Sequence, residues 1–214
     1  MDQNYTLFPD LPYVLDAYVV PTGKTFTLQP GVVMKFQQKG GLYIAGNLQA
    51  EGSADRPIVF TSLHDDECGI SGGCGDTDHA STTPAAGNWF ALLFNPSSGP
   101  SSLAHITVRF GGNGGVWQNP GAIRISSDAS VNISHATIEK NYYTGMRIEH
   151  ASPHISDSLI QEHKDTGGGQ SYGLFLTSSS TPVIANTHFK NNDVHIYTTD
   201  TTSSYIDGGG NVME

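Results

Sequence analysis

Four copies of one short pattern occupy the second half of the chain, and they constrain its fold more than any other feature. The copies begin at Leu103, Ile133, Ile155 and Ile184, which lie 30, 22 and 29 residues apart, and each has a second apolar residue five positions later. Short apolar runs bounded by turn residues are typical of strands. A further short strand precedes each copy, centred on Leu93, Ile123, Met146 and Leu174. A period of about 20 to 30 residues built from strands predicts stacked coils rather than a sandwich of hairpins.

Two columns of polar residues support the stacking. The third place of each copy holds His105, His135, Asp157 and Asn186, and the ninth holds Gly111, Asn141, His163 and Asn192. Asn and Asp accept left-handed backbone angles at corners, and like polar residues in coils about 4.8 Å apart can bond to one another. We therefore expect an asparagine ladder. The alternative is that surface turns simply attract Asn, Asp and Gly.

Particular motifs resemble the right-handed parallel β-helix of secreted microbial proteins, the superfold of the pectate lyases. The segment ISHATIEKNYYTGMRI matches the repeated I-S-x-x-x-I-x-x-N pattern with its following strand, and VVPTGKTFTLQPGVVMKF with GGLYIAGNLQAEGSADRPIVFTS resembles an opening run of such proteins. The resemblance implies an all-β, right-handed parallel β-helix (solenoid) of about seven coils, with one long corner insertion. It is specific for the fold and says little about function.

The resemblance also suggests how the chain is divided. Residues 13–214 would form the β-helix domain, and residues 1–12, with Tyr5, Leu7, Phe8 and Leu11, would cap its first coil. The far end would be covered by a flanking domain of a larger protein, because an open end is an unpaired edge. The residues expected to point inward are Phe26, Leu28, Val33, Ile44, Leu48, Ile58, Phe60, Leu93, Ile125, Ile148 and Leu176.

Residues 63–88 are expected to be the insertion between two coils, with Trp89 at the return to the core. A loop of this length is usually functional or held in place. Cys68 and Cys74, the only cysteines, enclose the flexible GISGG segment, which allows a disulfide. Two reduced thiols are the alternative, whereas a zinc site is disfavoured because no second ligand pair is present.

The same insertion is rich in acids and glycines. Asp65, Asp66, Asp76 and Asp78 supply hard oxygen ligands, and the glycines at 72, 73 and 75 permit backbone curvature that suits Ca²⁺. The run also resembles the D-D…G-G-D-T…P-x-x-G-x-W segment of related β-helix proteins. The alternative is an acidic, solvated loop without an ion.

The outward side of the strands that precede the copies is a second candidate site. One row is expected to hold Leu92, Arg124, Arg147, Phe175 and His195, and the next row Phe94, Ser126, Glu149, Thr177 and Tyr197. Aromatic faces beside Arg, Glu and His suit a glycan, so we expect ligand binding by Arg124, Arg147, Glu149, Phe175, His195 and Tyr197. If the protein is an enzyme, Arg124, Arg147, His195 and Tyr197 could supply a base and neutralise a uronate. The alternative is an ordinary protein surface.

Composition narrows the choice of function. The formal net charge of −10 argues against nucleic acid or an anionic membrane as partner, and no apolar run is long enough to span a membrane. Abundant Gly, Ser, Thr and Asn with little Lys favour an extracellular or cell-surface protein. We therefore expect a non-catalytic module, structural or carbohydrate-binding, whose partner is a polysaccharide or cell-surface glycan. The alternative is a polysaccharide-active lyase or glycoside hydrolase.

Overall fold

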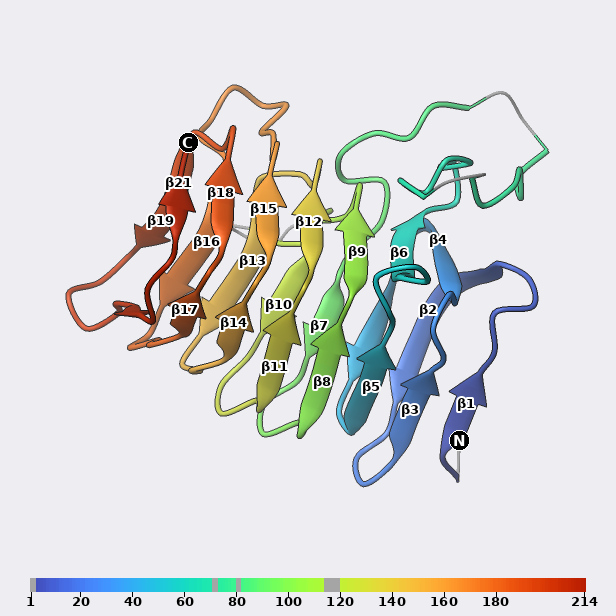
Figure 1. Cartoon of the computed structure of the whole chain (residues 1–214), viewed down its shortest axis with the longest axis horizontal. Helices are drawn as coiled ribbons and strands as arrows, with labels where there is room; N and C mark the ends of the chain where they lie inside the picture. Colours follow the sequence, from blue (N-terminus) through green and yellow to red (C-terminus); the bar gives the residue numbers. More distant parts are fainter. Residues whose placement is uncertain (1–2, 71–72, 80–81, 114–119) are drawn as a thin grey trace.

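The computed structural model describes residues 3–70, 73–79, 82–113 and 120–214. Within these ranges the regular structure consists of strands, and no helix that could cross a membrane is found there. The strands stack in parallel along one long axis, from the N-terminal coil to the C-terminal coil (Figure 1). This arrangement confirms the predicted all-β parallel solenoid.

Each coil has three faces, which we call faces A, B and C. Face A is an eight-stranded sheet, so its strands make seven steps along the axis. Its strands, in order, are β1 (Tyr5–Leu7), β3 (Thr25–Leu28), β5 (Asn47–Glu51), β8 (Ser101–Ala104), β11 (Val131–Ser134), β14 (His154–Ser156), β17 (Val183–Ala185) and β20 (Ile206–Asp207).

Faces B and C belong to one sheet that folds where two long strands, β2 (Tyr13–Val20) and β4 (Val33–Ile44), pass from one face to the other. Face B continues through β6 (Ile58–Ser62), β9 (Ile106–Arg109), β12 (Thr137–Glu139), β15 (Leu159–Gln161), β18 (His188–Lys190) and β21 (Val212–Met213). Face C continues through β7 (Leu92–Phe94), β10 (Ile123–Ile125), β13 (Thr144–Glu149), β16 (Tyr172–Thr177) and β19 (Val194–Thr198).

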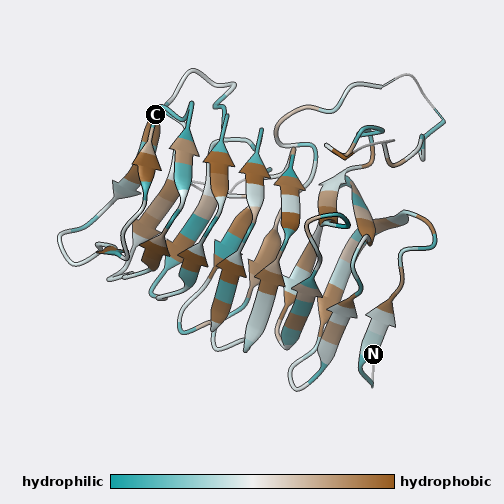
Figure 2. Cartoon of the chain, viewed as in Figure 1, coloured by the Kyte–Doolittle hydropathy of each residue, from teal (hydrophilic) through white to brown (hydrophobic). Residues whose placement is uncertain are grey.

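The repeat alignment is confirmed by the strand register. On face A, Ile133 pairs with Leu103 and with Ile155, and on face B the second apolar column pairs in the same way. The strands that precede the copies, on face C, also align, except that the first is shifted by one residue: Leu92 rather than Leu93 pairs with Ile123. Figure 2 shows the alternation of apolar and polar residues along the short strands, which places one side of each strand in the core.

The core runs the length of the solenoid and contains all the predicted inward residues except Val33 and Leu93. Leu93 points outward on face C, next to the inward Leu92. Val33 also lies outside the main core, yet it is buried beneath the insertion. Each fully buried aliphatic side chain contributes about 1.5–3 kcal/mol through removal from water.

The two polar columns have different roles. His105, His135, Asp157 and Asn186 are single left-handed residues at the corner between faces A and B. On this outer corner the rings of His105 and His135 stack 4.5 Å apart, and the Asn186 amide donates to Asp157 Oδ1 over 3.2 Å.

The other column forms a buried ladder at the corner between faces B and C. Asn141 Oδ1 accepts from the Gly111 N–H over 2.8 Å, and the Asn141 N–H donates to His163 Nδ1 over 3.3 Å. The His163 N–H in turn donates to Asn192 Oδ1 over 3.3 Å. The predicted ladder is therefore present, with His163 in place of one asparagine.

The two ends of the solenoid are covered to different extents. At the N-terminal end β1 pairs with β3, and Tyr5 and Leu7 pack against the core, whereas Phe8 and Leu11 are exposed. At the C-terminal end β19, β20 and β21 are the last strands in their sheets, and Ile206, Val212 and Met213 are exposed. The domain boundaries and the flanking domain remain predictions.

Candidate functional site

The insertion leaves face B after β6 and rejoins the coil before β7, and it lies over the outer surface of face B (Figure 1). Trp89 marks its return to the core: the ring is fully buried, stacks on Phe36 and donates to the Arg109 carbonyl over 2.8 Å. The outward row that begins beneath the insertion and continues along face B consists of Lys35, Thr61, Arg109, Glu139, Gln161 and Lys190.

Arg109 is the centre of this row and is 5% exposed. Its Nε lies 3.5 Å from Asp65 Oδ2 of the insertion and 3.5 Å from Glu139 Oε1 of β12. Asp65 also accepts from Thr61 Oγ1 over 2.5 Å and from the Cys68 N–H over 3.0 Å. Because removal of charges from water is unfavourable unless they are paired, this network fixes the insertion on face B.

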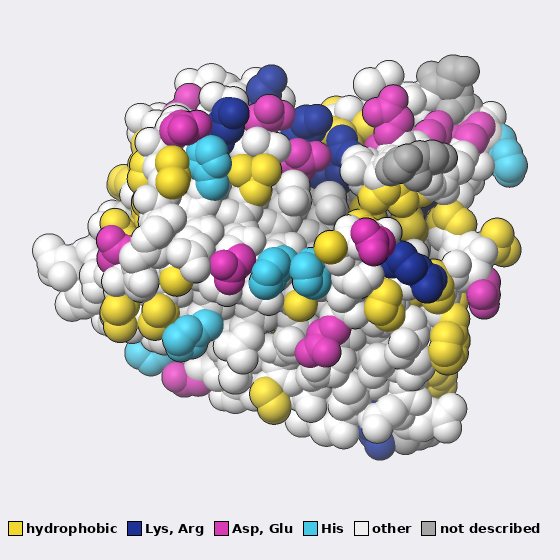
Figure 3. Space-filling view, viewed as in Figure 1, with side chains coloured by type: hydrophobic (Ala, Val, Ile, Leu, Met, Phe, Trp, Pro, Cys, Tyr) yellow, Lys and Arg dark blue, Asp and Glu magenta, His cyan; other side chains and the backbone are white. Residues whose placement is uncertain are grey.

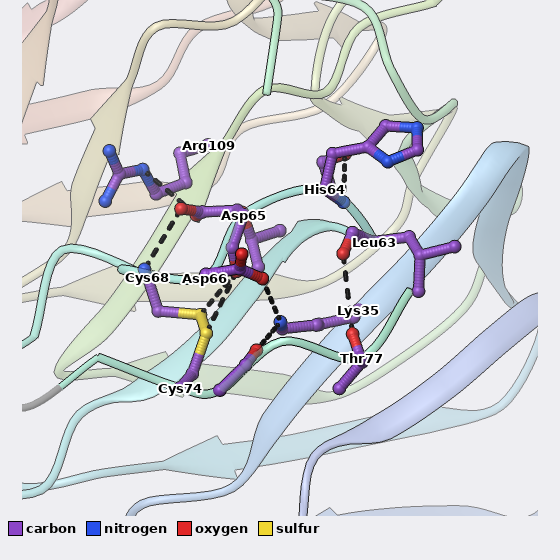
Figure 4. The surroundings of a disulfide bond; sticks show 12 residues. Lys35, Leu63, His64, Asp65, Asp66, Cys68, Cys74, Thr77 and Arg109 are labelled. Atoms are coloured by element: carbon purple, nitrogen blue, oxygen red, sulfur yellow. Dashed lines mark hydrogen bonds and ion pairs between the residues drawn. A yellow bond between two sulfur atoms is a disulfide. The ribbon is translucent and has the colours of Figure 1, made fainter. Parts of the chain in front are cut away.

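Lys35, on β4, anchors the insertion at a second point. Its side chain is fully buried, and its ammonium donates to the Gly75 carbonyl over 2.5 Å and lies 3.5 Å from Asp66 Oδ1. Figure 4 shows these contacts next to the disulfide. A carbonyl and a carboxylate of the insertion therefore converge on a cation that the protein itself supplies.

The predicted disulfide between Cys68 and Cys74 is present, with Cα atoms 5.7 Å apart. Cys68 is buried against Val33 and Val59 on the outer surface of face B, with Ile70 beside it. This second small core explains why Val33 is buried although it does not point into the solenoid. The disulfide therefore closes the insertion and also packs it against the strands.

The four acids predicted to bind Ca²⁺ have separate partners. Asp65 and Asp66 bond within the networks of Arg109 and Lys35. Asp78 lies 2.6 Å from His64 Nδ1, and Asp76 accepts from the His79 N–H over 2.6 Å. Among the residues that the structure describes, no group of three or more His, Cys, Asp or Glu side chains could hold a metal.

A Ca²⁺ ion takes six to eight oxygen ligands, whereas these four carboxylates each bond to a different group. Gly73 and Gly75 have the left-handed angles expected of them, and residue 72 lies outside the described ranges. The Ca²⁺ site thus stays a prediction.

Face C carries the second candidate site, and its register differs from the expected one. The outward row consists of Tyr43, Leu93, Arg124, Arg147, Phe175 and Tyr197. Tyr197 thus pairs with Phe175 and occupies the place expected for His195. Leu92 and Phe94 do not point outward as expected, because both are fully buried in the core. Glu149 lies in the neighbouring row, where it pairs with Thr177 as expected.

Arg124 and Arg147 lie opposite each other on β10 and β13. Burial and the positive charge of Arg147 both lower the pKa of Arg124. Arg124 lies over the ring of Phe90, 5.7 Å from its centroid, and Arg147 lies over Phe175 at 5.5 Å. Arg147 Nη2 also lies 3.4 Å from Glu149 Oε2. The two guanidinium groups are thus held in place by aromatic rings and one carboxylate.

Aromatic side chains extend the site toward the C-terminal coil. Phe175 is 3% exposed and packs between Tyr172 and Tyr197, whereas Tyr197 is 39% exposed. Tyr143 packs on Tyr172, and its burial raises the pKa of its hydroxyl to about 12. Of these aromatic residues Tyr197 has the most exposed ring, and it packs against the buried ring of Phe175.

His195 does not join this group. Its ring lies 6.2 Å from the ring of Phe189, a core residue of β18. Burial lowers the pKa of His195, and the charge of nearby His188 lowers it further. His195, the side chain expected to act as a base, is therefore not in the row that contains Arg124 and Arg147.

The charged row on face B was missed from the sequence, although a signal for it is present. Arg109, Glu139, Gln161 and Lys190 each follow directly after the second apolar residue of a copy, so the repeat aligns them. Tyr43 and Phe90 were also missed, because they precede the four copies from which the alignment was built.

Comparison with known proteins agrees with the fold. Residues 97–210, more than half of the 214-residue chain, match the family described as the right handed beta helix region. No curated protein and no solved structure matched the chain. On this match and the parallel solenoid described above, the chain belongs to the family of right-handed β-helix proteins.

Proposed function

We propose that this protein is a non-catalytic, extracellular or cell-surface β-helix module that binds a uronate-containing polysaccharide along face C. The observation that carries the proposal is the register of β10 and β13, which places Arg124 and Arg147 side by side. Phe90 flanks this pair on one side, and Phe175 with Tyr197 flanks it on the other.

The charge of the pair favours an anionic ligand. Two guanidinium groups on neighbouring strands repel each other, and the lowered pKa of Arg124 reflects burial together with this repulsion. A ligand carboxylate can accept hydrogen bonds from both groups and remove the repulsion. Such local recognition is compatible with the net charge of −10, because the other charges are distributed over the whole chain.

The aromatic side chains favour a sugar over a simple anion. The row follows the solenoid axis, so an extended polymer lying along it would contact several coils in turn. Tyr43 and Tyr197 lie in the same row as the arginines and would contact the apolar sides of neighbouring sugar rings. A chain of alternating acidic groups and ring faces fits this order of side chains.

Binding without catalysis is favoured by the placement of the acid–base groups. A lyase needs a base beside the uronate, but His195 lies against Phe189 and outside the row. Glu149 is bonded to Arg147. The disulfide supports an extracellular setting, since disulfides persist in oxidising compartments. The larger protein and its flanking domains are part of the same proposal.

Calorimetric titration with oligogalacturonate and alginate oligomers tests this proposal. In the variant R124Q/R147Q we expect at least about a tenfold loss of affinity, because two charge-assisted hydrogen bonds are removed. Arg56→Gln is the matched control, because this exposed arginine lies away from face C. Equal affinity in the wild type and R124Q/R147Q would refute the site. Ultraviolet absorbance from new unsaturated sugar ends would show that the protein is a lyase instead.

A further inference from the structure

Two cavities lie between the insertion and the coils, on the face B side of the corner between faces B and C. One cavity of about 450 Å³ is lined by residues that include Thr82, Pro84, Asp65, Arg109, Phe110 and Lys140. A second cavity of about 220 Å³ shares Pro84, Phe110 and Lys140 with the first and continues to Glu162 and Lys164. The two cavities share three lining residues and therefore adjoin each other, and we refer to them together as the groove.

The floor of the groove is built by the repeat. Phe110, Lys140 and Glu162 are equivalent residues that end face B in successive coils, and all three have left-handed backbone angles. The insertion supplies the opposite wall through residues 82–86. The groove is therefore a product of both the regular coils and the irregular loop.

The charges that line the groove nearly balance. The two cavities contain three basic side chains and four acidic ones, and buried Lys35 is paired with one of the acids. Figure 3 shows basic and acidic side chains close together along the upper edge of this face. Asp65 and Arg109 are already paired with each other. A strongly anionic ligand would therefore approach Asp66 and Glu67, whereas a cation would approach Lys140 and Lys164. A neutral ligand with many hydroxyl groups can both donate to the acids and accept from the bases.

The apolar part of the lining fits the same kind of ligand. The apolar part of the lining consists of Pro84, Ala85 and Ala86 from the insertion and Phe110 from the floor. Binding sites for small ligands combine such apolar surfaces with a few polar groups and usually enclose about 300–1,000 Å³. A sugar ring has both an apolar C–H face and hydroxyl groups at its edge.

We propose that this groove binds a short segment of a neutral oligosaccharide, with Lys140 and Lys164 donating to its hydroxyl groups and Pro84 and Phe110 contacting a ring face. This site is separate from the uronate site proposed on face C, and its residues are different. A protein with both sites would hold two polysaccharides of different charge at once.

Titration with neutral oligosaccharides of glucose, xylose, mannose and galactose tests the proposal, with heat and amide chemical shifts as readouts. We expect at least one to bind and to shift the amides of Phe110 and Lys140 rather than that of Tyr197. In Lys140→Met and Lys164→Met the affinity should fall by at least about fivefold, as expected for a lost hydrogen bond to a charged group. Lys190→Met is the matched control, because Lys190 is on face B but outside both cavities.

Two further results separate this site from the one on face C. R124Q/R147Q should lose uronate binding and keep neutral oligosaccharide binding, so either proposal can fail alone. Absence of binding by every neutral sugar at millimolar concentration would overturn the groove proposal. Binding that is unchanged in both lysine variants, with unchanged melting midpoints, would overturn it as well.

Discussion

Faces B and C both carry arginine on their outer surfaces, yet the two surroundings differ. On face B, Arg109 is buried between Asp65 and Glu139 beneath the insertion. On face C, Arg124 lies beside a second arginine, Arg147. A cation enclosed by carboxylates stabilises the structure, whereas two neighbouring cations repel each other and could be paired by the ligand anion that we propose for face C. The surroundings of an arginine on this scaffold therefore depend on the charges that the insertion and the adjacent coils place beside it.

The largest expected effect is on face B. Arg109→Ala leaves Asp65 and Glu139 buried without their cation, so we expect a loss of about 3–5 kcal/mol in the free energy of unfolding. The matched variant on face C, Arg147→Ala, should cost about 1 kcal/mol or less, because its partner Glu149 is 44% exposed in its side chain. Urea unfolding measures both. Equal losses would end the distinction between the two faces.

Removal of the disulfide tests whether the insertion must be closed covalently to stay packed on face B. Replacement of Cys68 and Cys74 by Ser should lower the free energy of unfolding by about 2 kcal/mol, the value expected for a short closed loop. Reductant should destabilise the wild type by a similar amount and leave the double variant unchanged. A wild type whose stability is insensitive to reductant would show that packing on Val33 and Val59 holds the insertion without the bond.

His163, in the ladder at the corner between the two faces, predicts a pH dependence. Burial lowers its pKa from 6.5 to about 3 in the folded protein. Between these values the unfolded chain binds the proton and the folded one does not. Its contribution to stability is therefore complete above pH 6.5 and is lost as the pH falls toward about 3, by up to about 1.4 kcal/mol per pH unit.

The variant His163→Asn isolates this contribution. An asparagine Oδ1 can accept from the Asn141 N–H as the histidine Nδ1 does, so the ladder is kept while the titrating group is removed. We expect urea unfolding of the variant to show a shallower loss of stability between pH 6.5 and 4. The same slope in both proteins would assign the acid sensitivity to other groups.

The smallest expected effect concerns the metal. The four acids of the insertion bond to separate partners, so we expect chelation followed by added Ca²⁺ to leave the melting midpoint unchanged. The Lys35→Met variant sharpens this comparison, because it frees Asp66 and the Gly75 carbonyl from their cation. A midpoint that rises with Ca²⁺ concentration in the wild type would support the predicted calcium site.

The repeat itself was predictable because it is local. Leu103, Ile133, Ile155 and Ile184 recur with the same neighbours, and any fold that buries them together must stack their coils. The disulfide was predictable for a similar reason, since Cys68 and Cys74 are close in sequence. The pairing of Tyr197 rather than His195 with Phe175 could not be predicted in this way. A shift of the register by two residues leaves the alternation of apolar and polar residues along the strand unchanged.

By itself the sequence determined the parallel solenoid, the corner ladder and the place of the insertion, because stacking repeats an interaction that each copy already specifies. Only the tertiary structure decided which charges meet. Asp65 contacts Arg109, and Lys35 contacts Asp66, because the insertion folds back over face B. The insertion contains no repeat, so its sequence does not predict where on the solenoid it packs. Contacts between distant segments depend on packing in three dimensions, so only the tertiary structure separates the buried charge network on face B from the arginine and aromatic row on face C.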